Sequence, residues 1–179
     1  MTATTVATFA SGSISISSGS GVLLTNSVYL FTIVTTNPIP WGGYLTMVVP
    51  SAVTVPGSLT IACIYGCTNT IAPALVSGTT WNLKGLFVST YTRAGDTLIF
   101  TITGFTNPSS TTAVAFTFTS RDTSSGDYAI DTISTMTVTA TQGAITISSL
   151  HPTDSYKIYD IPTSYTIIMT VEHAVGTTY

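Results

Sequence analysis

Apolar and polar residues alternate along much of this chain with the two-residue period of a β-strand. The run at 28–34 carries apolar or β-branched groups at every position, so both faces of that strand are suited to burial. Similar runs recur about every ten to fifteen residues, and no stretch has the period of an amphipathic helix. The pattern predicts an all-β chain, with an antiparallel Ig-like β-sandwich over residues 21–141. Its further strands are expected at 44–49, 58–64, 81–88, 97–103, 113–119, 128–133 and 134–141.

The segment after residue 34 predicts how the first two strands connect. Pro38 and Pro40 lack the N–H that a sheet ladder requires, so the strand ends before them. Gly42-Gly43 then allows the chain to reverse, which predicts a long β-hairpin with Trp41 at a rigid tip. A large aromatic side chain on a weakly charged surface favours association. We therefore expect Trp41 to be at least partly covered, by another strand end or by a neighbouring subunit.

Polar arms flank the predicted sandwich on both sides. Residues 1–20 are rich in Thr, Ser and Gly, and Ile14 and Ile16 alternate there with serines. This alternation predicts an edge strand at 13–18, and the two isoleucines are candidate interface residues. Residues 142–179 form a C-terminal extension, which is either a strand donor or part of a second sandwich.

The C-terminal extension repeats part of the N-terminal sequence. Ile-x-Ile-Ser-Ser occurs at 14–18 and at 145–149, and the strand-forming runs 27–33 and 163–169 follow. The second copy resembles the first two strands of another sandwich, which cannot bury an apolar face unaided. We expect a neighbouring chain to complete it by β-augmentation, whereas the alternative is that 164–171 folds back onto its own sandwich. The candidate interface residues here are Tyr165, Ile167, Met169 and Val171.

The composition excludes several classes of protein. Only 6% of the residues are charged, against roughly 25% in average soluble domains, and about a third are Ser or Thr. The net charge of −3, with four Lys and Arg, excludes the basic surface that nucleic-acid binding requires. No apolar run approaches the ~20 residues of a transmembrane segment. Residues 1–20 lack the features of a secretion signal, so we expect a removed leader or a fragment of a longer protein.

Cys63 and Cys67 are the only cysteines of the chain. Three interpretations are open: a local disulfide around Gly66, half of a metal site, or two free buried thiols. No second pair of ligands accompanies them, and both histidines are distant in the sequence. The disulfide is favoured, and it would indicate an oxidising compartment, extracellular or at the cell surface.

Asp122, Asp127 and Asp131 are the candidates for a calcium site, because carboxylates on loops bind this ion. Their spacing matches no EF-hand loop, and Asx turns explain them better, so neither a metal nor a cofactor is predicted. A catalytic serine would need a Gly-x-Ser-x-Gly elbow, which the sequence lacks. His151 and His173 are interpreted as solvent-facing, and the chain is not predicted to be an enzyme.

Glycosylation is possible by one route only. No Asn-x-Ser/Thr sequon with a residue other than proline at x occurs, which excludes N-linked glycans by this signal. The density of Ser and Thr, with Pro among them, permits covalent O-linked glycans, which would keep a weakly charged surface soluble. The β-propensity of threonine accounts for much of the same composition.

Several turn motifs of the predicted sandwich stand in a recognisable order. They are Asn37-Pro38-Ile39-Pro40, Gly42-Gly43, Leu45-Thr46-Met47-Val48-Val49-Pro50-Ser51, Gly104-Phe105-Thr106-Asn107-Pro108-Ser109-Ser110 and Tyr128-Ala129-Ile130-Asp131. Over residues 20–141 this order resembles a β-sandwich unit repeated in large cell-surface proteins of ciliates and other protists. The resemblance implies a modular extracellular surface or adhesive role and supplies no catalytic residues. Those proteins string many units together, whereas this chain carries one unit and a remnant, which favours assembly from short subunits.

Two functions from different classes fit these observations. The first is a structural subunit of an extracellular filament or surface assembly, polymerising head to tail with copies of itself by β-strand exchange or augmentation. It rests on the low charge, the polar arms and the absence of a chemical site. The second is a monomeric adhesive or carbohydrate-binding module that uses the exposed aromatics Trp41, Tyr65 and Tyr91. The first is favoured.

Overall fold

The computed structural model describes residues 5–19, 21–87, 92–123, 126–152 and 165–171. These residues form strands joined by loops, and none of them lies in a helix that could cross a membrane. The strands are β1 (Ala7–Thr8), β2 (Ser11–Gly19), β3 (Asn26–Val34), β4 (Tyr44–Val48), β5 (Thr60–Tyr65), β6 (Ala72–Ser77), β7 (Thr80–Lys84), β8 (Thr97–Thr106), β9 (Val114–Asp122), β10 (Tyr128–Val138), β11 (Ile145–Pro152) and β12 (Tyr165–Val171).

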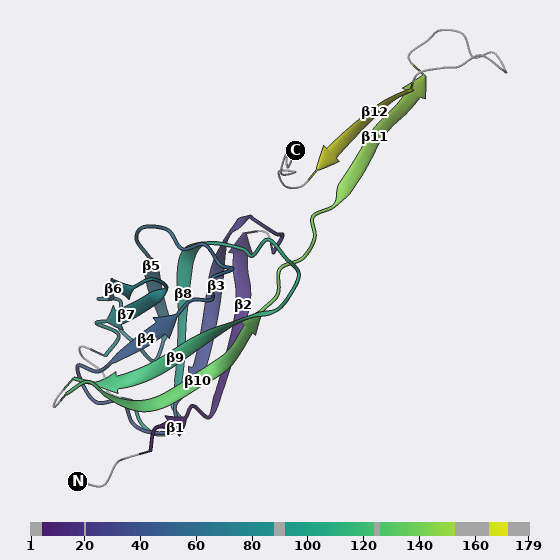
Figure 1. Cartoon of the computed structure of the whole chain (residues 1–179). Helices are drawn as coiled ribbons and strands as arrows, with labels where there is room; N and C mark the ends of the chain where they lie inside the picture. The colour runs from purple at the N-terminus through teal and green to yellow at the C-terminus, as the bar shows by residue number, and fades with distance from the viewer. Residues whose placement is uncertain (1–4, 20, 88–91, 124–125, 153–164, 172–179) are drawn as a thin grey trace.

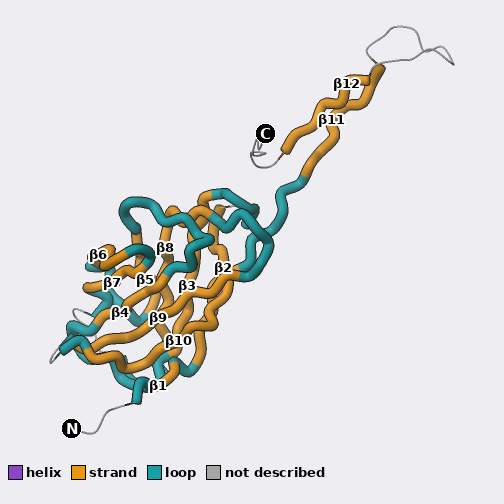
Figure 2. Tube along the Cα trace, in the orientation of Figure 1, coloured by secondary structure: helices purple, strands orange, loops and turns teal. Residues whose placement is uncertain are grey.

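The strands β1 to β10 form two sheets that pack against each other around one core (Figures 1 and 2). One sheet has the order β2-β3-β8-β5 and the other the order β1-β10-β9-β4-β7-β6. Neighbouring strands pair antiparallel, except that the short β1 runs parallel to β10. The predicted all-β sandwich is therefore confirmed.

Phe31 of β3 lies at the centre of the core. Its ring stacks on Phe100 of the adjacent β8, with 5.4 Å between the ring centroids. From the opposite sheet, Phe116 and Phe118 of β9 meet it edge-on, at 5.5 Å and 5.2 Å. All four side chains are fully buried. Such aromatic pairs contribute about 0.5–1.5 kcal/mol each beyond the burial of their area. One face of the run at 28–34 therefore packs on the opposite sheet as predicted, whereas the other face is only partly buried and not fully buried.

The predicted hairpin between the first two strands is wrong. β3 belongs to the four-stranded sheet, whereas β4 lies between β7 and β9 in the six-stranded sheet. The segment 35–43 therefore crosses from one sheet to the other. Its backbone is fixed by distant loops: the Ile39 N–H donates to the Thr92 hydroxyl at 2.8 Å. The Gly42 N–H donates to the Phe87 carbonyl at 2.9 Å. The prolines end β3 as expected, but a local pattern does not determine which sheet the next strand joins.

Most of the N-terminal arm belongs to the sandwich. β2 pairs with β3, and Ile14 and Ile16 pack half-buried against the chain's own core, so these two candidate interface residues have an intramolecular role. Gly12 lies where β2 passes close to β10, and a Cβ there would lie 2.8 Å from the Met136 sulfur. Only glycine allows that approach without a shift of the methionine. The sandwich thus begins before residue 20.

The C-terminal strands β11 and β12 form a separate antiparallel pair, hereafter the ribbon. The ribbon projects away from the sandwich beyond the end of β10 (Figure 1). β12 is paired with β11, so the alternative in which 164–171 adds to its own sandwich is not the arrangement observed.

Candidate functional site

One side of the ribbon is apolar. Directly opposite residues of an antiparallel pair point to the same face, as Ile147 and Met169 do. Side chains two positions apart along one strand also point to the same face. The described side chains on this side have exposed fractions from 41% for Val171 to 65% for Ile145. The apolar face of the ribbon comprises Ile145, Ile147, Leu150, Tyr165, Ile167, Met169 and Val171. It includes the four contact residues predicted in this segment.

The opposite side of the ribbon is mainly polar. It carries Thr146, Thr166 and Thr170, together with Ile168 as an exception at 50% exposure. A two-stranded sheet with one apolar and one polar side normally places the apolar side on a core. The ribbon therefore has the polarity of a sheet layer, but its apolar side is exposed in the described part of the chain.

Among the described residues, the outer edges of the ribbon are also open. Each of its two strands has a paired neighbour on one side only, and neither contains Asp, Glu, Lys or Arg. Natural edge strands are commonly protected by charged residues, because unpaired N–H and C=O groups pair readily with another chain. The ribbon lacks this protection.

Cys63 and Cys67 form the predicted disulfide, with an S–S distance of 2.00 Å and the Cα atoms 5.8 Å apart. The metal and free-thiol interpretations are therefore wrong. Gly66, between the cysteines, has a φ of 72°, and a Cβ there would collide with the Thr97 carbonyl oxygen. The Cys63 N–H donates to the Asn69 side-chain oxygen at 2.8 Å, so it is not available to another strand.

The structure does not bring the three aspartates together as one group of ligands. No group of three or more His, Cys, Asp or Glu side chains that could hold a metal occurs in the described ranges. Asp122 ends β9, and Asp127 sits in the adjoining turn with a φ of 57°. Asp131 is fully buried, and its carboxylate accepts hydrogen bonds from the backbone of Thr36 and from Asn37. Its role is to fix the segment that crosses between the sheets.

A cluster around Tyr44 was not visible in the sequence. Arg121 donates from Nε to the Thr46 hydroxyl and from Nη1 to the Asp127 carbonyl, both at 2.9 Å. The Lys84 ammonium lies 5.4 Å from the centroid of the Tyr44 ring. Burial, and then the charge and hydrogen bond of Asp127, raise the pKa of the Tyr44 hydroxyl. These residues are far apart in the sequence, and only the pairing of β4 with β7 and β9 brings them together.

Trp41 lies at the surface with 72% of its side chain exposed. Its loop is held near the β9–β10 turn, because the Thr123 hydroxyl donates to the Gly42 carbonyl at 3.2 Å. The described part of the chain therefore leaves most of the Trp41 side chain uncovered, and the alternative, cover by a neighbouring subunit, stays a prediction.

The remaining predicted residues lie apart from one another. Tyr65 is 64% exposed and follows the disulfide cysteine of β5, and His151 lies in β11. The interpretations of Tyr91 and His173 concern residues outside the described ranges.

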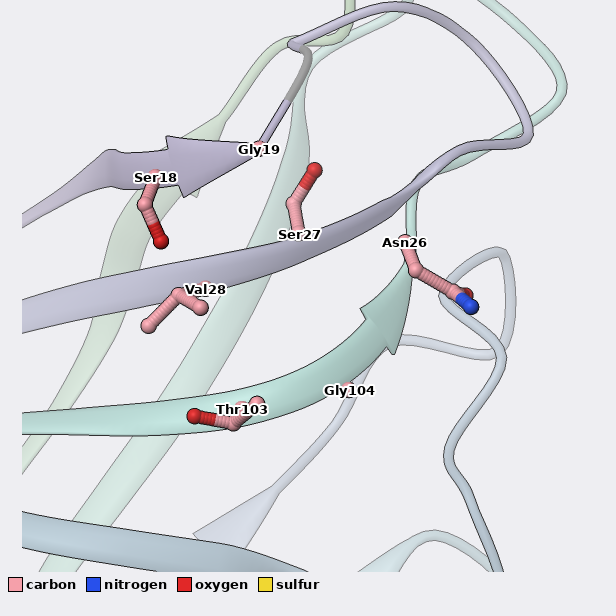
Figure 3. A pocket seen from close by; sticks show the side chains of 7 residues that line it. All are labelled: Ser18, Gly19, Asn26, Ser27, Val28, Thr103 and Gly104. Carbon is pink, nitrogen blue, oxygen red and sulfur yellow. The ribbon is translucent and has the colours of Figure 1, made fainter.

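A shallow hollow of about 310 Å³ lies beside β2, β3 and β8 (Figure 3). It coincides with the register shifts of β2 against β3 and of β3 against β8. None of its lining residues is charged or aromatic, so it offers no ring on which a sugar could stack. The lining residues are Ser18, Gly19, Asn26, Ser27, Val28, Thr103 and Gly104.

The fold and its ribbon define an all-β sandwich protein with an appended amphipathic hairpin. No family model matches the chain, and no curated protein matches it. One similar solved structure is the crystal structure of BslA, a bacterial hydrophobin. It is 15% identical, the match covers 78% of this chain and 98% of that one, and the TM-score is 0.46. So distant a likeness carries no argument about function.

Proposed function

We propose that the chain is a structural subunit of an extracellular filament or surface assembly, joined to its neighbours by β-strand augmentation. One observation carries the proposal: the ribbon stands outside its own sandwich with an exposed apolar face and unprotected edges. An isolated two-stranded hairpin is marginally stable in water, so pairing with a neighbouring chain would stabilise it. The proposal includes no enzymatic activity.

A head-to-tail arrangement follows if the ribbon of one subunit adds to a sheet of the next. Such a contact is heterologous, and it extends into a filament because it does not close on itself. The low content of charged residues favours this self-association, and O-linked glycans on the many Ser and Thr residues would keep the assembly soluble.

An extracellular location is part of the same proposal. The Cys63–Cys67 disulfide is typical of oxidising compartments. The order of turn motifs that resembles repeated units of protist surface proteins also favours a surface location.

The test compares the full chain with a variant that ends at Gln142 and therefore lacks the ribbon. Both are purified, concentrated and imaged by negative-stain electron microscopy. We expect filaments or sheets from the full chain only, and a folded, dispersed sandwich from the shorter one. Circular dichroism and intact mass establish that the shorter chain is folded and that its disulfide is formed. Fibres from the shorter chain would refute the role of the ribbon.

A carbohydrate-binding module is the second candidate, and the exposure of Trp41 favours it. Exposed aromatic rings stack on sugars, and Tyr128 is also 59% exposed at the start of β10. Binding on a glycan array that is lost in Trp41→Ala, by a chain that stays monomeric at high concentration, would support this function over assembly.

A further inference from the structure

The pairing of β2 with β3 contains a β-bulge, by which a second strand pair of the same kind can be recognised. Ile16 lies opposite Tyr29, and the register then shifts so that Ser18 lies opposite Val28. Ser17 is the extra residue, and its hydroxyl donates to the Val28 carbonyl at 3.3 Å. A β-bulge of this kind bends and twists a strand, and it fixes the register of the pair.

The ribbon has the same signature. Ile147 lies opposite Met169, and the register then shifts so that Ser149 lies opposite Ile168. Ser148 is the extra residue, and its hydroxyl donates to the Ile168 carbonyl at 3.0 Å. The bulge falls at the same place in the repeated motif Ile-x-Ile-Ser-Ser, so the ribbon repeats the β2–β3 pair in backbone pairing as well as in sequence.

This correspondence shows what kind of surface the apolar face is. Met169 takes the position of Tyr29, and Val171 takes that of Phe31. Tyr29 and Phe31 are fully buried in the sandwich, whereas Met169 is 57% and Val171 is 41% exposed. The sequence repeat alone aligns Tyr29 with Tyr165, whereas the strand pairing aligns it with Met169. Tyr165 and Met169 lie on the same face of the ribbon. The apolar face of the ribbon corresponds to the core-facing side of a sandwich layer.

In the sandwich, the corresponding face is covered by an apolar layer from the opposite sheet. The ring of Phe31 packs on Phe116 and Phe118 of β9, which are fully buried. A face of this type is therefore completed by a second apolar layer that packs on it side chain to side chain. In another copy of the chain, the apolar layer of β9 is already covered by that copy's own β2 and β3, so the ribbon has no free place there.

We propose that a second copy of this chain covers the apolar face with its own ribbon, the two ribbons packing face to face about a two-fold axis. The two faces are identical, uncharged and equal in width, so each supplies the layer that the other lacks. The ribbon stands clear of the sandwich, which leaves room for a second chain to approach (Figure 1). The result is a small four-stranded sandwich shared by two subunits.

The size of the ribbon sets the strength of this contact. β12 has seven residues, so at about 3.4 Å per residue the apolar face is roughly 24 Å long. Two paired strands make it roughly 10 Å wide. The area is about 240 Å² per ribbon, well below the roughly 800 Å² per partner of a standard interface. The dimer is therefore weak by itself and depends on protein concentration.

This inference goes beyond the proposed function, because it concerns the side-chain face of the ribbon, whereas strand augmentation uses its backbone edges. The two contacts are compatible within one assembly. They are also separable by experiment, since a substitution on the face need not change the edge.

The first test measures self-association of the full chain by sedimentation over concentrations up to about 1 mM. Ile147→Asp places a charge on the apolar face, and the matched control Thr146→Asp places the same charge on the opposite side of the same strand. We expect concentration-dependent self-association that begins with a dimer for the native chain and for Thr146→Asp, and at least a tenfold weaker dimerisation step for Ile147→Asp. A monomeric native chain, or an equal loss in both variants, would overturn the proposal.

The second test identifies what the face contacts. Met169→Cys introduces the only free thiol, because both native cysteines are in a disulfide. Under mild oxidation we expect a disulfide-linked dimer through residue 169, and far less from the control Thr170→Cys on the other side. A dimer in sedimentation without this cross-link would place the ribbon on another surface of the second copy and contradict the two-fold packing.

The outcomes for the two proposals are distinguishable. Filaments that persist in Ile147→Asp would leave the proposed assembly standing and refute the face-to-face packing. Face-dependent dimers that never form larger objects would support the packing and refute the assembly.

Discussion

Asp131 on β10 holds Asn37 by two hydrogen bonds, one from the backbone N–H at 2.9 Å and one from the side-chain amide at 2.7 Å. The same carboxylate also accepts the N–H of Thr36 at 3.0 Å. Asp131 is fully buried, and the residues that it binds begin the segment crossing from one sheet to the other. One aspartate thus fixes the path of the chain between the two layers.

We expect Asp131→Ala to destabilise the sandwich by about 3 kcal/mol, because three donors lose the carboxylate acceptor that the buried Asp131 supplies. Urea unfolding monitored by circular dichroism measures the effect. Asp96→Ala is the control, since Asp96 accepts the Arg93 N–H on an exposed turn and its loss should cost less than about 1 kcal/mol. Equal midpoints for the two variants would show that the buried carboxylate has no special structural role.

Stability should fall at alkaline pH because of Tyr29. Its side chain is fully buried, its hydroxyl donates to the Asn107 side chain at 2.8 Å, and burial raises its pKa to about 12. In the unfolded chain the pKa of tyrosine is about 10. The folded state therefore holds the proton more tightly, and its advantage is complete below pH 10 and is lost as the pH rises from about 10 to 12.

Tyr29→Phe tests this prediction. The variant should be less stable near pH 7 by about 1–2 kcal/mol, because the buried hydrogen bond from the Tyr29 hydroxyl to the Asn107 oxygen is lost. It should also show a smaller decline above pH 10. Some decline will remain, since the pKa of Tyr44 is raised as well. Unfolding free energies measured at neutral pH and above pH 10 give both values, and an unchanged alkaline slope would contradict the assignment to Tyr29.

The Cys63–Cys67 disulfide closes a very short loop, so its contribution should be at the low end of the usual range, about 2 kcal/mol. Without reductant, alkylation should add no mass to the unfolded protein. With reductant, the urea midpoint should decrease while the protein remains folded at low urea. Two alkylations before reduction would mean free thiols, and complete unfolding on reduction would mean that the bond matters far more than its loop length implies.

The positions of most strands were predictable from local alternation, and their connections were not. The run at 28–34 became β3 because a strand with apolar groups on both faces suits the centre of a sheet. The next strand was assigned to the same hairpin, yet it joined the other sheet. β6 was not among the expected strands, because Leu75 and Val76 are exposed on an edge and only the pairing with β7 defines it.

The same limit explains which parts of the candidate sites were found. The ribbon was predictable because its repeated motif is contiguous, and so was a disulfide between cysteines close in sequence. The role of Asp131 was missed, since its partner Asn37 is far away along the chain and no local pattern links them. For Trp41 the sequence left two kinds of cover open, a strand end or a neighbouring subunit, because it gives the size of a side chain but not the direction of its loop.

Trp41 should report on assembly. In Trp81→Phe it is the only tryptophan, and with 72% exposure its emission in isolated subunits should be red-shifted and readily quenched by acrylamide. If a neighbouring subunit covers it in the assembly, the emission should shift to the blue and quenching should decrease. Trp81 is 4% exposed, so Trp41→Phe provides the control with a buried reporter that should not change. Fully solvated emission from Trp41 in the assembled protein would refute the expected cover.

Hydrogen exchange should distinguish the ribbon from the sandwich. A two-stranded hairpin that packs on nothing is marginally stable, so in dilute subunits the amides of Tyr165–Val171 should exchange rapidly. The amides of Asn26–Val34, in the centre of a sheet, should remain protected. At concentrations where ribbons pair, exchange in β12 should slow by at least tenfold, because opening then requires dissociation.

The variant Ile147→Asp gives the decisive control for this exchange experiment. Its ribbon should exchange rapidly at every concentration at which the subunits do not assemble through their edges, while β3 stays as protected as in the native chain. Protection of β12 in dilute native subunits, equal to that at high concentration, would mean that the ribbon is stable by itself. The apolar face would then not need a second copy to order it, and the reason for expecting ribbon pairing would be removed.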